Sequence, residues 1–376
     1  MIADRALADD PRVVLTLDAG GTNFSFSAIR GGQPIGDAVT LPAEPHDLEA
    51  SLRNLLAGFQ ALIDQIDDQI DQKPAAISFA FPGPADYPNG VIFNVGNLPA
   101  YQGGVAVGPM LEERFGVPVF LNNDGDLFAY GEAIAGLLPE INRELEAAGS
   151  PKRYRNLIGL TLGTGLGGGI VIDGRLLTGD NSAGGEFWLL RNKVRSDCFA
   201  EEGASIRAVQ SAYAEAAGVA ADGLTPKDIH DIATGAAAGN PQAARQAFER
   251  LGEVVGDALA NVMTLIDGLA VIGGGLAGAA SLFLPRVMAE LNGSIASYSG
   301  GTTGRLIQHA YDLGDPAQRK EFLQGETREI AVPHSSRTVI TDPWKRVGVG
   351  ISTLGAGRAV GVGAYAFALN RLGHPF

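Results

Sequence analysis

Residues 13–23 read VVLTLDAGGTN, and residues 157–169 read LIGLTLGTGLGGG. In both, an apolar run enters a loop of glycine and threonine: residues 20–22, the first glycine loop, and 163–165, the second glycine loop. A second apolar run and a tight turn follow, an order typical of a β-hairpin. Glycines let backbone N–H groups approach an anion closely, and threonine adds a hydroxyl donor. The repeat predicts two phosphate-binding hairpins that hold a nucleotide between two similar domains; the alternative is two ordinary hairpins with glycine turns.

Composition narrows the class of protein. The chain has 376 residues, enough for about two domains, and its 28 basic against 42 acidic residues give a net charge of −14. Nucleic acids and anionic membranes need a basic surface, so neither is an expected partner. Cys198 is the only cysteine, which excludes an internal disulfide and a cysteine-rich zinc site. Without a secretory pattern at the N-terminus or an apolar run long enough to span a bilayer, we expect a cytoplasmic protein.

Hydrophobic periodicity outside the glycine loops predicts alternating strands and helices. This order predicts an α/β protein with a largely parallel sheet and ligands at the carboxyl ends of its strands. The charged stretch 139–155 reads as irregular and marks the expected domain boundary, and Ser294–Trp344 stays unassigned. The expected helices are Leu48–Ile70, Leu127–Leu138, Gln242–Ile266 and Gly355–Leu372, and the expected strands are Ala75–Phe81, Val117–Leu121 and Leu269–Ile272.

Asp124 is the expected general base. None of the five histidines lies in a glycine-rich loop or at a clear strand end, so proton transfer falls to a carboxylate. Asp124 follows a predicted strand and precedes a predicted helix, where it can accept the proton of a substrate hydroxyl that attacks a phosphoryl group. The alternative is a helix N-cap, for which Asn and Asp are preferred residues.

Asp18 indicates a divalent cation. It lies beside the first glycine loop, where a carboxylate repels a phosphate unless a cation intervenes. Because Mg²⁺ keeps most of its hydration shell, we expect Asp18 to hold Mg²⁺ through water. The alternative is an Asx-turn, in which the side chain bonds its own loop.

Gly273-Gly274-Gly275 follows another predicted strand. It could let an adenine ring lie against the backbone, or place a helix N-terminus near a phosphate. Residues 163–168 match the letters of a dinucleotide fingerprint, but they lead into a predicted strand, whereas that fingerprint opens a helix. The hairpin context therefore argues against a dehydrogenase.

Several polar side chains could bind the hydroxyls of a polyol. Asn97 lies in a polar loop, and Glu186 and the pair Glu201-Glu202 follow the second hairpin. Carboxylates and amides suit a polyol because each can bond two hydroxyls. Trp188 either floors such a pocket or fills a core, and we favour the core.

The glycine-rich and polar segments described above, in their order along the chain, resemble those of the ROK family of sugar kinases, within the actin-like, hexokinase-type ATPase superfamily. The resemblance runs from Val13 to about Ala208 and from about Gly252 to Gly278, and includes the C-terminal helix. It implies an α/β fold of two actin-like (ribonuclease H-like) domains with an interdomain cleft: a small domain of residues 1–138 plus 358–376, and a large domain of residues 139–357. The matching segments are Asp18–Asn23, Phe81–Pro84, Asn97–Pro99, Asn123-Asp124 with Gly131–Ala133, Leu162–Gly169 and Val271–Gly275.

By that resemblance the chain phosphorylates a hexose, glucose or a close epimer, at the 6-hydroxyl, with ATP, Mg²⁺ and Asp124 as general base. An N-acetylhexosamine or fructose is the alternative substrate, and a homo-oligomer (dimer or tetramer) is implied. The implied nucleotide-binding residues are Asp18, Gly20, Gly21, Thr22, Asn23, Gly163, Thr164, Gly165, Gly273, Gly274 and Gly275. The implied sugar-binding residues are Gly83, Asn97, Asn123, Glu186 and Glu201, the last because Glu201 and Ser205 keep the family's spacing; Glu202 is its rival.

Two departures from the family pattern bear on function. The histidine that usually follows three residues after the glutamate is Leu189 here, and the usual cysteine-rich zinc segment keeps only Cys198 within residues 193–198. We therefore expect no structural zinc and an altered sugar contact. A sensor without catalysis is a further alternative, against which Asp124 and both glycine loops argue. Family repressors carry a DNA-binding segment ahead of the first loop, and here twelve residues precede Val13 in an acidic chain.

Overall fold

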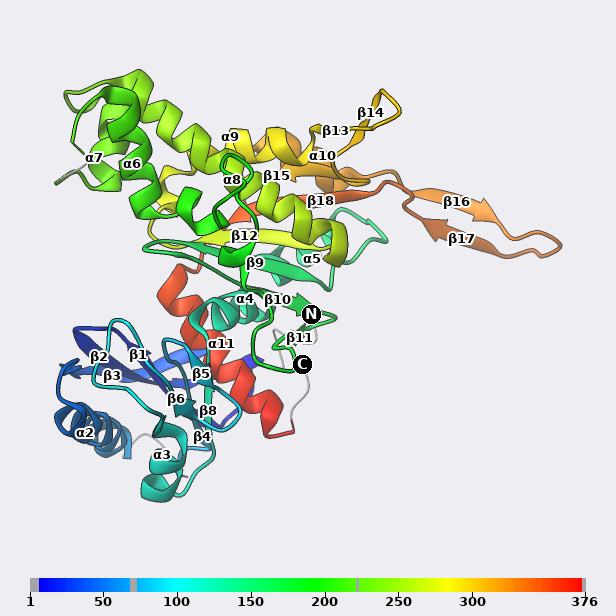
Figure 1. Ribbon diagram of the computed structural model, residues 1–376. Helices are drawn as coiled ribbons and strands as arrows, with labels where there is room; N and C mark the ends of the chain where they lie inside the picture. Colours follow the sequence, from blue (N-terminus) through cyan, green and yellow to red (C-terminus); the bar gives the residue numbers. More distant parts are fainter. Residues whose placement is uncertain (1–6, 68–72, 221–222, 374–376) are drawn as a thin grey trace. The chain divides into compact units, whose positions relative to one another are not determined.

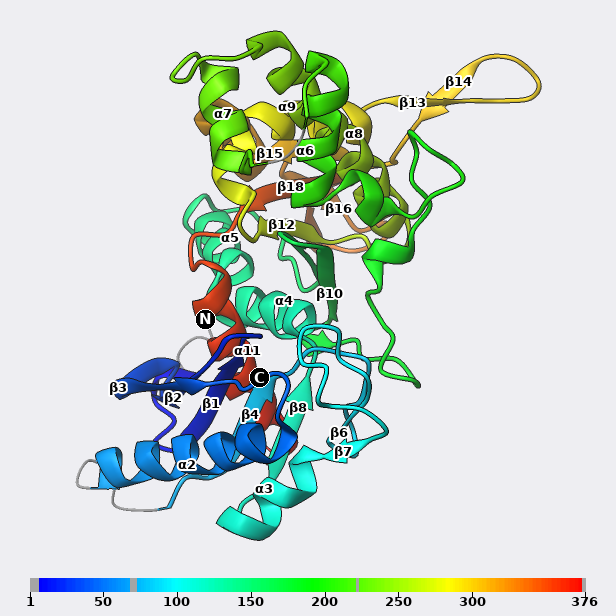
Figure 2. The ribbon, with the colours of Figure 1, turned by 60° about the vertical axis from the view of Figure 1, so that its left-hand side comes forward.

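The computed structural model describes residues 7–67, 73–220 and 223–373. Contacts divide the chain into two compact units: the first comprises Met1–Pro139, Gly169–Gly185 and Leu354–Phe376, and the second comprises Glu140–Gly168 and Glu186–Thr353. In each unit, helices pack on a β-sheet (Figures 1 and 2). Residues 169–185, expected in the large domain, have their contacts in the first unit.

A five-stranded sheet in the order β3-β2-β1-β4-β8 forms the centre of the first unit. β1 runs antiparallel to β2 and parallel to β4, and β4 runs parallel to β8. α2 and α3 pack on one face of this sheet, and α11 packs on the other (Figure 2). The elements are β1 (Val13–Ala19), β2 (Asn23–Arg30), β3 (Gln33–Pro42), α2 (Leu48–Ile66), β4 (Ala76–Ala80), β5 (Ala85–Asp86), β6 (Val91–Ile92), β7 (Val105–Ala106), α3 (Val107–Phe115), β8 (Val119–Asn122), α4 (Asp124–Ala135), β11 (Arg175–Leu176) and α11 (Ala356–Arg371).

The sequence explains the central strand and its covering helix. Because β1 has helices on both faces, every one of its residues is buried except Asp18. The Asp47 side chain accepts a hydrogen bond from the backbone N–H of Ala50 at 3.0 Å and so caps the N-terminus of α2. α2 buries one apolar face, as its periodicity predicts, and ends at Ile66; Ile70, expected in this helix, lies outside the described residues.

Glycines bring α4 and α11 into backbone contact. A Cβ added to Gly131 would lie 1.9 Å from the carbonyl oxygen of Ala359, and one added to Gly363 would lie 1.9 Å from that of Leu127. Only glycine fits at either position. The expected close-packed helix near the C-terminus is therefore confirmed, and it completes the core of the first unit.

A six-stranded sheet has the order β11-β10-β9-β12-β18-β15; the division between the units falls within β10, so β11 belongs to the first unit and β9, β12, β18 and β15 belong to the second. β12 runs parallel to β9 and β18, and β18 runs parallel to β15. The elements are β9 (Leu157–Leu162), β10 (Leu166–Ile172), η2 (Phe187–Leu189), η3 (Ala200–Gly203), α6 (Ile206–Ala217), α7 (Pro226–Thr234), α8 (Pro241–Ile266), β12 (Leu269–Gly273), η4 (Ala277–Ala279), α9 (Ala280–Leu291), β13 (Ser294–Ala296), β14 (Thr302–Gly304), β15 (His309–Asp312), α10 (Pro316–Gln324), β16 (Arg328–Ala331), β17 (Thr338–Thr341) and β18 (Arg346–Ile351).

One sequence expectation about this region is wrong. The stretch 139–155 is not irregular throughout, because α5 (Leu137–Ala147) covers its first part. Pro139 lies in the first turn of α5, where its missing N–H leaves no helical bond unmade. Ile141 and Leu145 are fully buried, so an amphipathic face holds the helix in place despite its many charges.

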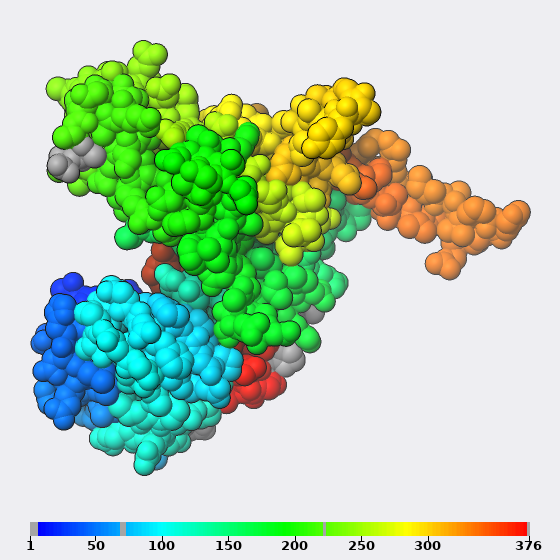
Figure 3. All heavy atoms as spheres, in the orientation of Figure 1, coloured from blue at the N-terminus to red at the C-terminus, as the bar shows by residue number. Residues whose placement is uncertain are grey.

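The unassigned region Ser294–Trp344 contains two β-hairpins, one strand of the main sheet and α10. The β16–β17 hairpin extends away from the rest of its unit (Figures 1 and 3). Its apolar side chains Ile330, Val339 and Ile340 are exposed. Among the described helices, none combines the length and the apolar character needed to cross a bilayer.

Candidate functional site

In the first unit, three strand ends meet at one edge of the sheet. Asp18 on β1 lies opposite Ala80 on β4, and Ala80 lies opposite Asn122 on β8. The first glycine loop joins β1 to β2 at this edge. A Cβ added to Gly21 would lie 3.2 Å from the backbone oxygen of Asn97 and 3.3 Å from its Cβ. The structure therefore brings the first glycine loop, Asn97 and the end of β8 together, as expected at the carboxyl edge of a parallel sheet.

Asp124 begins α4, immediately after β8. The Oδ1 atom of Asn123 accepts a hydrogen bond from the backbone N–H of Gly125 at 2.8 Å, so Asn123 is the N-cap. The alternative that Asp124 is the cap is therefore wrong, although its Oδ1 also accepts from that N–H at 3.0 Å. The Asp124 side chain remains exposed at a helix N-terminus, where the helix dipole favours a negative charge.

Asp18 is the exposed residue of an otherwise buried strand. Among the described residues, its carboxylate makes no hydrogen bond or ion pair, so the Asx-turn alternative is wrong. No group of three His, Cys, Asp or Glu side chains that could hold a metal occurs in the described part of the chain. Mg²⁺ keeps several waters and often takes one carboxylate beside substrate phosphates, and the exposed carboxylate of Asp18 is of the type that such a site uses.

The loop after β4 contains Gly83, which is joined to Pro84 by a cis peptide bond. The Tyr87 hydroxyl donates a hydrogen bond to the carbonyl oxygen of Phe81 at 3.0 Å and lies 3.1 Å from where a Cβ on Gly83 would be. Tyr87 therefore packs against the loop at the glycine that the resemblance assigns to the sugar.

In the second unit, a glutamate supports the second glycine loop. This loop joins β9 to β10 and leads into a strand, as expected. The Oε2 atom of Glu201 accepts a hydrogen bond from the backbone N–H of Leu166 at 3.0 Å. A Cβ added to Gly165 would lie 2.4 Å from that same oxygen. The glutamate thus occupies the space that any larger residue at position 165 would need.

Arg207 holds the two glutamates of η3. It donates hydrogen bonds to Oε1 of Glu201 at 3.1 Å and to Oε1 of Glu202 at 2.6 Å. We call Glu201 and Arg207 together the loop brace. Both carboxylate oxygens of Glu201 accept hydrogen bonds, whereas the Glu202 carboxylate bonds only Arg207 among the described residues. Sequence reasoning selected Glu201 from its spacing to Ser205, and no sequence signal indicated Arg207.

Gly273-Gly274-Gly275 packs against the end of β9, immediately before the second glycine loop. Gly273 pairs opposite Thr161 in the parallel ladder, and Leu276 donates a hydrogen bond to the carbonyl oxygen of Leu162 at 3.0 Å. Gly274 has φ +88°, and a Cβ there would lie 2.4 Å from the same carbonyl. No atom lies within 4 Å of the position that a Cβ on Gly275 would take, so its backbone is open to a ligand.

Glu186 is exposed and accepts a hydrogen bond from the indole N–H of Trp188. The expectation that Trp188 fills the core is wrong, because its ring is half-buried, bonded to Glu186 and in edge contact with Phe199 at 5.6 Å. Leu189, at the position of the usual histidine, is 57% exposed. The tryptophan, rather than residue 189, therefore orients the glutamate.

The loop of residues 192–198, which the resemblance matches to a zinc segment, is organised by hydrogen bonds. The Oδ1 atom of Asn192 accepts from the backbone N–H groups of Val194 and Arg195 at 2.9 and 3.0 Å. The backbone N–H of Asn192 donates to the carbonyl oxygen of Cys198 at 3.0 Å, which closes the loop. These bonds are those of a side-chain-capped turn.

The fold is that of proteins built from two actin-like, ATPase-type domains. Within that class, the chain belongs to the ROK family, because a sequence model of this family matches residues 14–314. The crystal structure of a glucokinase from Parabacteroides distasonis is 54% identical and superposes with a TM-score of 0.88 over 97% of this chain and 99% of that one.

Curated relatives are more distant. An N-acetyl-D-glucosamine kinase from Vibrio cholerae is 33% identical over 46% of this chain and 51% of its own length, so the alignment spans about half of that relative. An N-acetylmannosamine kinase from Salmonella arizonae is 27% identical over 83% of this chain and 99% of its own length. These proteins share the family while differing in the sugar in their names.

Proposed function

We propose that this chain is an ATP-dependent sugar kinase that phosphorylates a hexose, glucose or a close epimer, at the 6-hydroxyl in the cytoplasm. The observation that carries the proposal is the exposed Asp124 at the strand edge that also presents Asp18 and the first glycine loop. Family membership and the 54% identity to a glucokinase structure support it. The names of the Vibrio and Salmonella relatives favour an N-acetylhexosamine as the second candidate substrate.

In this proposal Asp124 accepts the proton of the sugar hydroxyl as the hydroxyl oxygen attacks the γ-phosphorus of ATP. Asp124 needs no metal to act as a base, and its helix N-terminus stabilises the carboxylate until the proton arrives. Asp18 would hold Mg²⁺ through water, and the ion would supply positive charge to neutralise the phosphates. The backbone N–H groups of the nucleotide-binding residues named above orient the phosphates.

Each unit presents polar groups that can bind a sugar oxygen. Asn97 lies beside the first glycine loop, and Asn123 keeps its Nδ2 amide for a sugar oxygen while its Oδ1 caps α4. In the second unit, Glu186 is oriented by Trp188. The carboxylate of Glu201 has lone pairs beyond those used in the loop brace, so it can accept a sugar hydroxyl as well.

A coupled assay of ADP release tests the proposal. Purified protein with ATP and Mg²⁺ is given glucose, mannose, fructose, N-acetylglucosamine and N-acetylmannosamine in turn. Sugar-dependent ADP release with glucose or mannose, at a kcat/KM above that of the other sugars, is the expected result. Faster turnover of an N-acetylhexosamine would select the second candidate, and no sugar-dependent release with any of them would exclude a kinase.

A further inference from the structure

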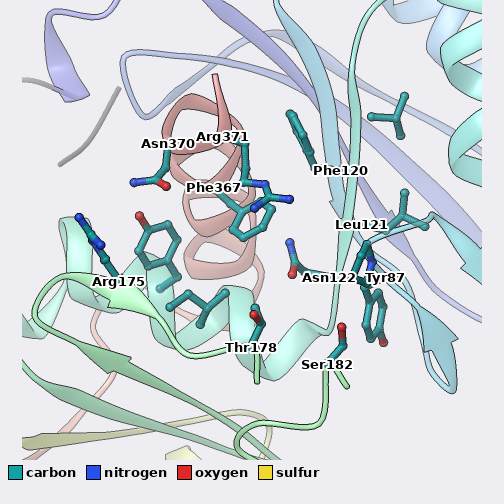
Figure 4. A pocket seen from close by; sticks show the side chains of 14 residues that line it. Tyr87, Phe120, Leu121, Asn122, Arg175, Thr178, Ser182, Phe367, Asn370 and Arg371 are labelled. Carbon is teal, nitrogen blue, oxygen red and sulfur yellow. The ribbon is translucent and has the colours of Figure 1, made fainter. Parts of the chain in front are cut away.

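A cavity of about 270 Å³ lies in the first unit, beside β8 on the side of α11 (Figure 4). Phe120 of β8 and Phe367 of α11 meet edge to face there, with ring centroids 6.1 Å apart. Neighbouring strand residues point to opposite faces, so Phe120 and Asn122 share the face toward α11. The cavity is therefore distinct from the exposed edge where Asp124 begins α4.

Asn122 places an unsatisfied donor against this cavity. It is 3% exposed, and its Nδ2 atom has no hydrogen-bond partner in the described structure. A buried amide without a partner costs free energy that an acceptor atom would recover. Because the Asn122 side chain lines the cavity (Figure 4), the missing acceptor fits an oxygen atom of a bound ligand.

The cavity is also cationic in an acidic protein. None of its 14 lining residues is acidic, and two of them are Arg175 and Arg371, although the whole chain has a net charge of −14. Among the described residues, no carboxylate pairs with either arginine. The Arg371 guanidinium lies 5.8 Å from the centre of the Phe367 ring, on the same side of the cavity as Asn122, while Arg175 lies on the opposite side (Figure 4).

Neutral donors and an aromatic wall complete the lining. The hydroxyl groups of Thr178 and Tyr130 belong to residues that line the cavity, and a phenol is protonated near neutral pH. Phe367 offers an aromatic surface for the C–H face of a ring compound. The volume is just below the usual range for sites that bind drug-sized molecules, which suits a monosaccharide with one phosphate and is too small for a nucleoside triphosphate.

We propose that this cavity is a second ligand site, which binds a phosphorylated monosaccharide. Arg371 binds the phosphate, Arg175 adds positive charge from the opposite side, and Asn122 and Thr178 bind ring oxygens. Asn122 is two residues from Asp124, so a ligand bonded to its amide bears on the segment that carries the general base. That the ligand belongs to the same class as the reaction product rests on the proposed function, and it makes the site a candidate for feedback by product.

Isothermal titration of the full-length chain with glucose 6-phosphate, glucose and inorganic phosphate tests this proposal without requiring activity. Each titration is repeated with glucose in excess, which occupies the proposed active site. Saturable binding of glucose 6-phosphate that persists in excess glucose, and is at least about tenfold tighter than binding of inorganic phosphate, is the expected result. Failure of the kinase assay would leave this measurement unaffected.

Variants locate the binding. Arg371→Gln and Arg175→Gln should each weaken glucose 6-phosphate binding about tenfold. Arg358→Gln is the matched control, since Arg358 is an exposed arginine on the same α11 that bonds Gln33 instead, and it should bind like the wild type. Absent binding, loss of binding in excess glucose, equal affinity for inorganic phosphate, or indifference to both arginine variants would each overturn the proposal.

Discussion

The two glycine loops follow one local plan and are supported in different ways. The first rests on backbone: Gly21 lies against Asn97, and a Cβ on Gly20 would lie 2.9 Å from the carbonyl oxygen of Asn23. The second rests on a side chain, because Glu201 bonds the loop and Arg207 bonds Glu201. Local sequence thus determines the hairpin, whereas distant residues determine how firmly the loop is held.

The largest expected effect lies in the first unit and leaves both loops untouched. Asp124→Asn keeps one acceptor for the N–H of Gly125 but cannot take a proton. We expect kcat to fall by about 10²–10⁴-fold with the KM for sugar nearly unchanged. Steady-state kinetics and a melting curve check this. A variant with normal kcat that merely melts earlier would show that Asp124 serves α4 and not the reaction.

Alanine substitution of one glycine in each loop should lower activity by different amounts, because the two loops are supported differently. Gly165→Ala would place its Cβ 2.4 Å from the Glu201 carboxylate, and we expect kcat/KM for ATP to fall by about 10²-fold. Gly21→Ala meets Asn97 only at 3.2 Å, so a loss of about tenfold is expected. Both variants are compared at equal folded fraction by circular dichroism. Equal losses in the two variants would contradict the difference in support.

Substitution in the loop brace should have a smaller effect, and it should change the KM values for both substrates. Glu201→Gln weakens the bond to Arg207 and removes the charge available to a sugar hydroxyl, so we expect the KM values for ATP and for sugar each to rise about tenfold. Glu202→Gln is the matched control and should change both KM values less than about twofold. If Glu202→Gln raises the KM for sugar and Glu201→Gln does not, Glu202 is the sugar ligand.

We expect removal of zinc to have the smallest effect on activity. We expect no stoichiometric zinc by elemental analysis, because Asn192 organises the 192–198 loop with its own side chain. A chelator should abolish activity only by removing Mg²⁺, and added Mg²⁺ alone should restore it. About one zinc per chain, or inactivation that Mg²⁺ does not reverse, would contradict this.

The sequence predicted the elements whose apolar pattern is strong. Nearly all residues are buried in the strands β1, β9 and β12, and α8 buries a long apolar face. The residue pattern alone therefore indicates strand or helix in these elements. α5 escaped prediction because charges and Pro139 obscure two buried positions, Ile141 and Leu145.

Side-chain contacts between distant residues were not predicted from the sequence, for a different reason. The bonds from Arg207 to Glu201 and from Glu201 to Leu166 join residues whose spacing follows neither a helical nor a strand period. The indole of Trp188 bonds Glu186, two residues away, at the start of η2, and no strand or helix pattern in the sequence indicated that contact. Site residue types were accessible from sequence, while their mutual contacts depend on the folded chain.

The contact of α11 with α4 has a consequence for synthesis. α11 belongs to the first unit, yet the ribosome makes it after all of the second unit, because residues 186–353 lie between β11 and α11. The first unit must therefore wait, with the α4 surface at Gly131 and Leu127 uncovered, while the second unit can already fold. Domains usually fold in the order in which they are translated. Here the first unit can complete its fold only after the whole of the second unit has been synthesised. Once α11 is made, the hydroxyl of Tyr365 accepts a hydrogen bond from the backbone N–H of Gly31 at 2.9 Å and so ties the last helix to the turn between β2 and β3.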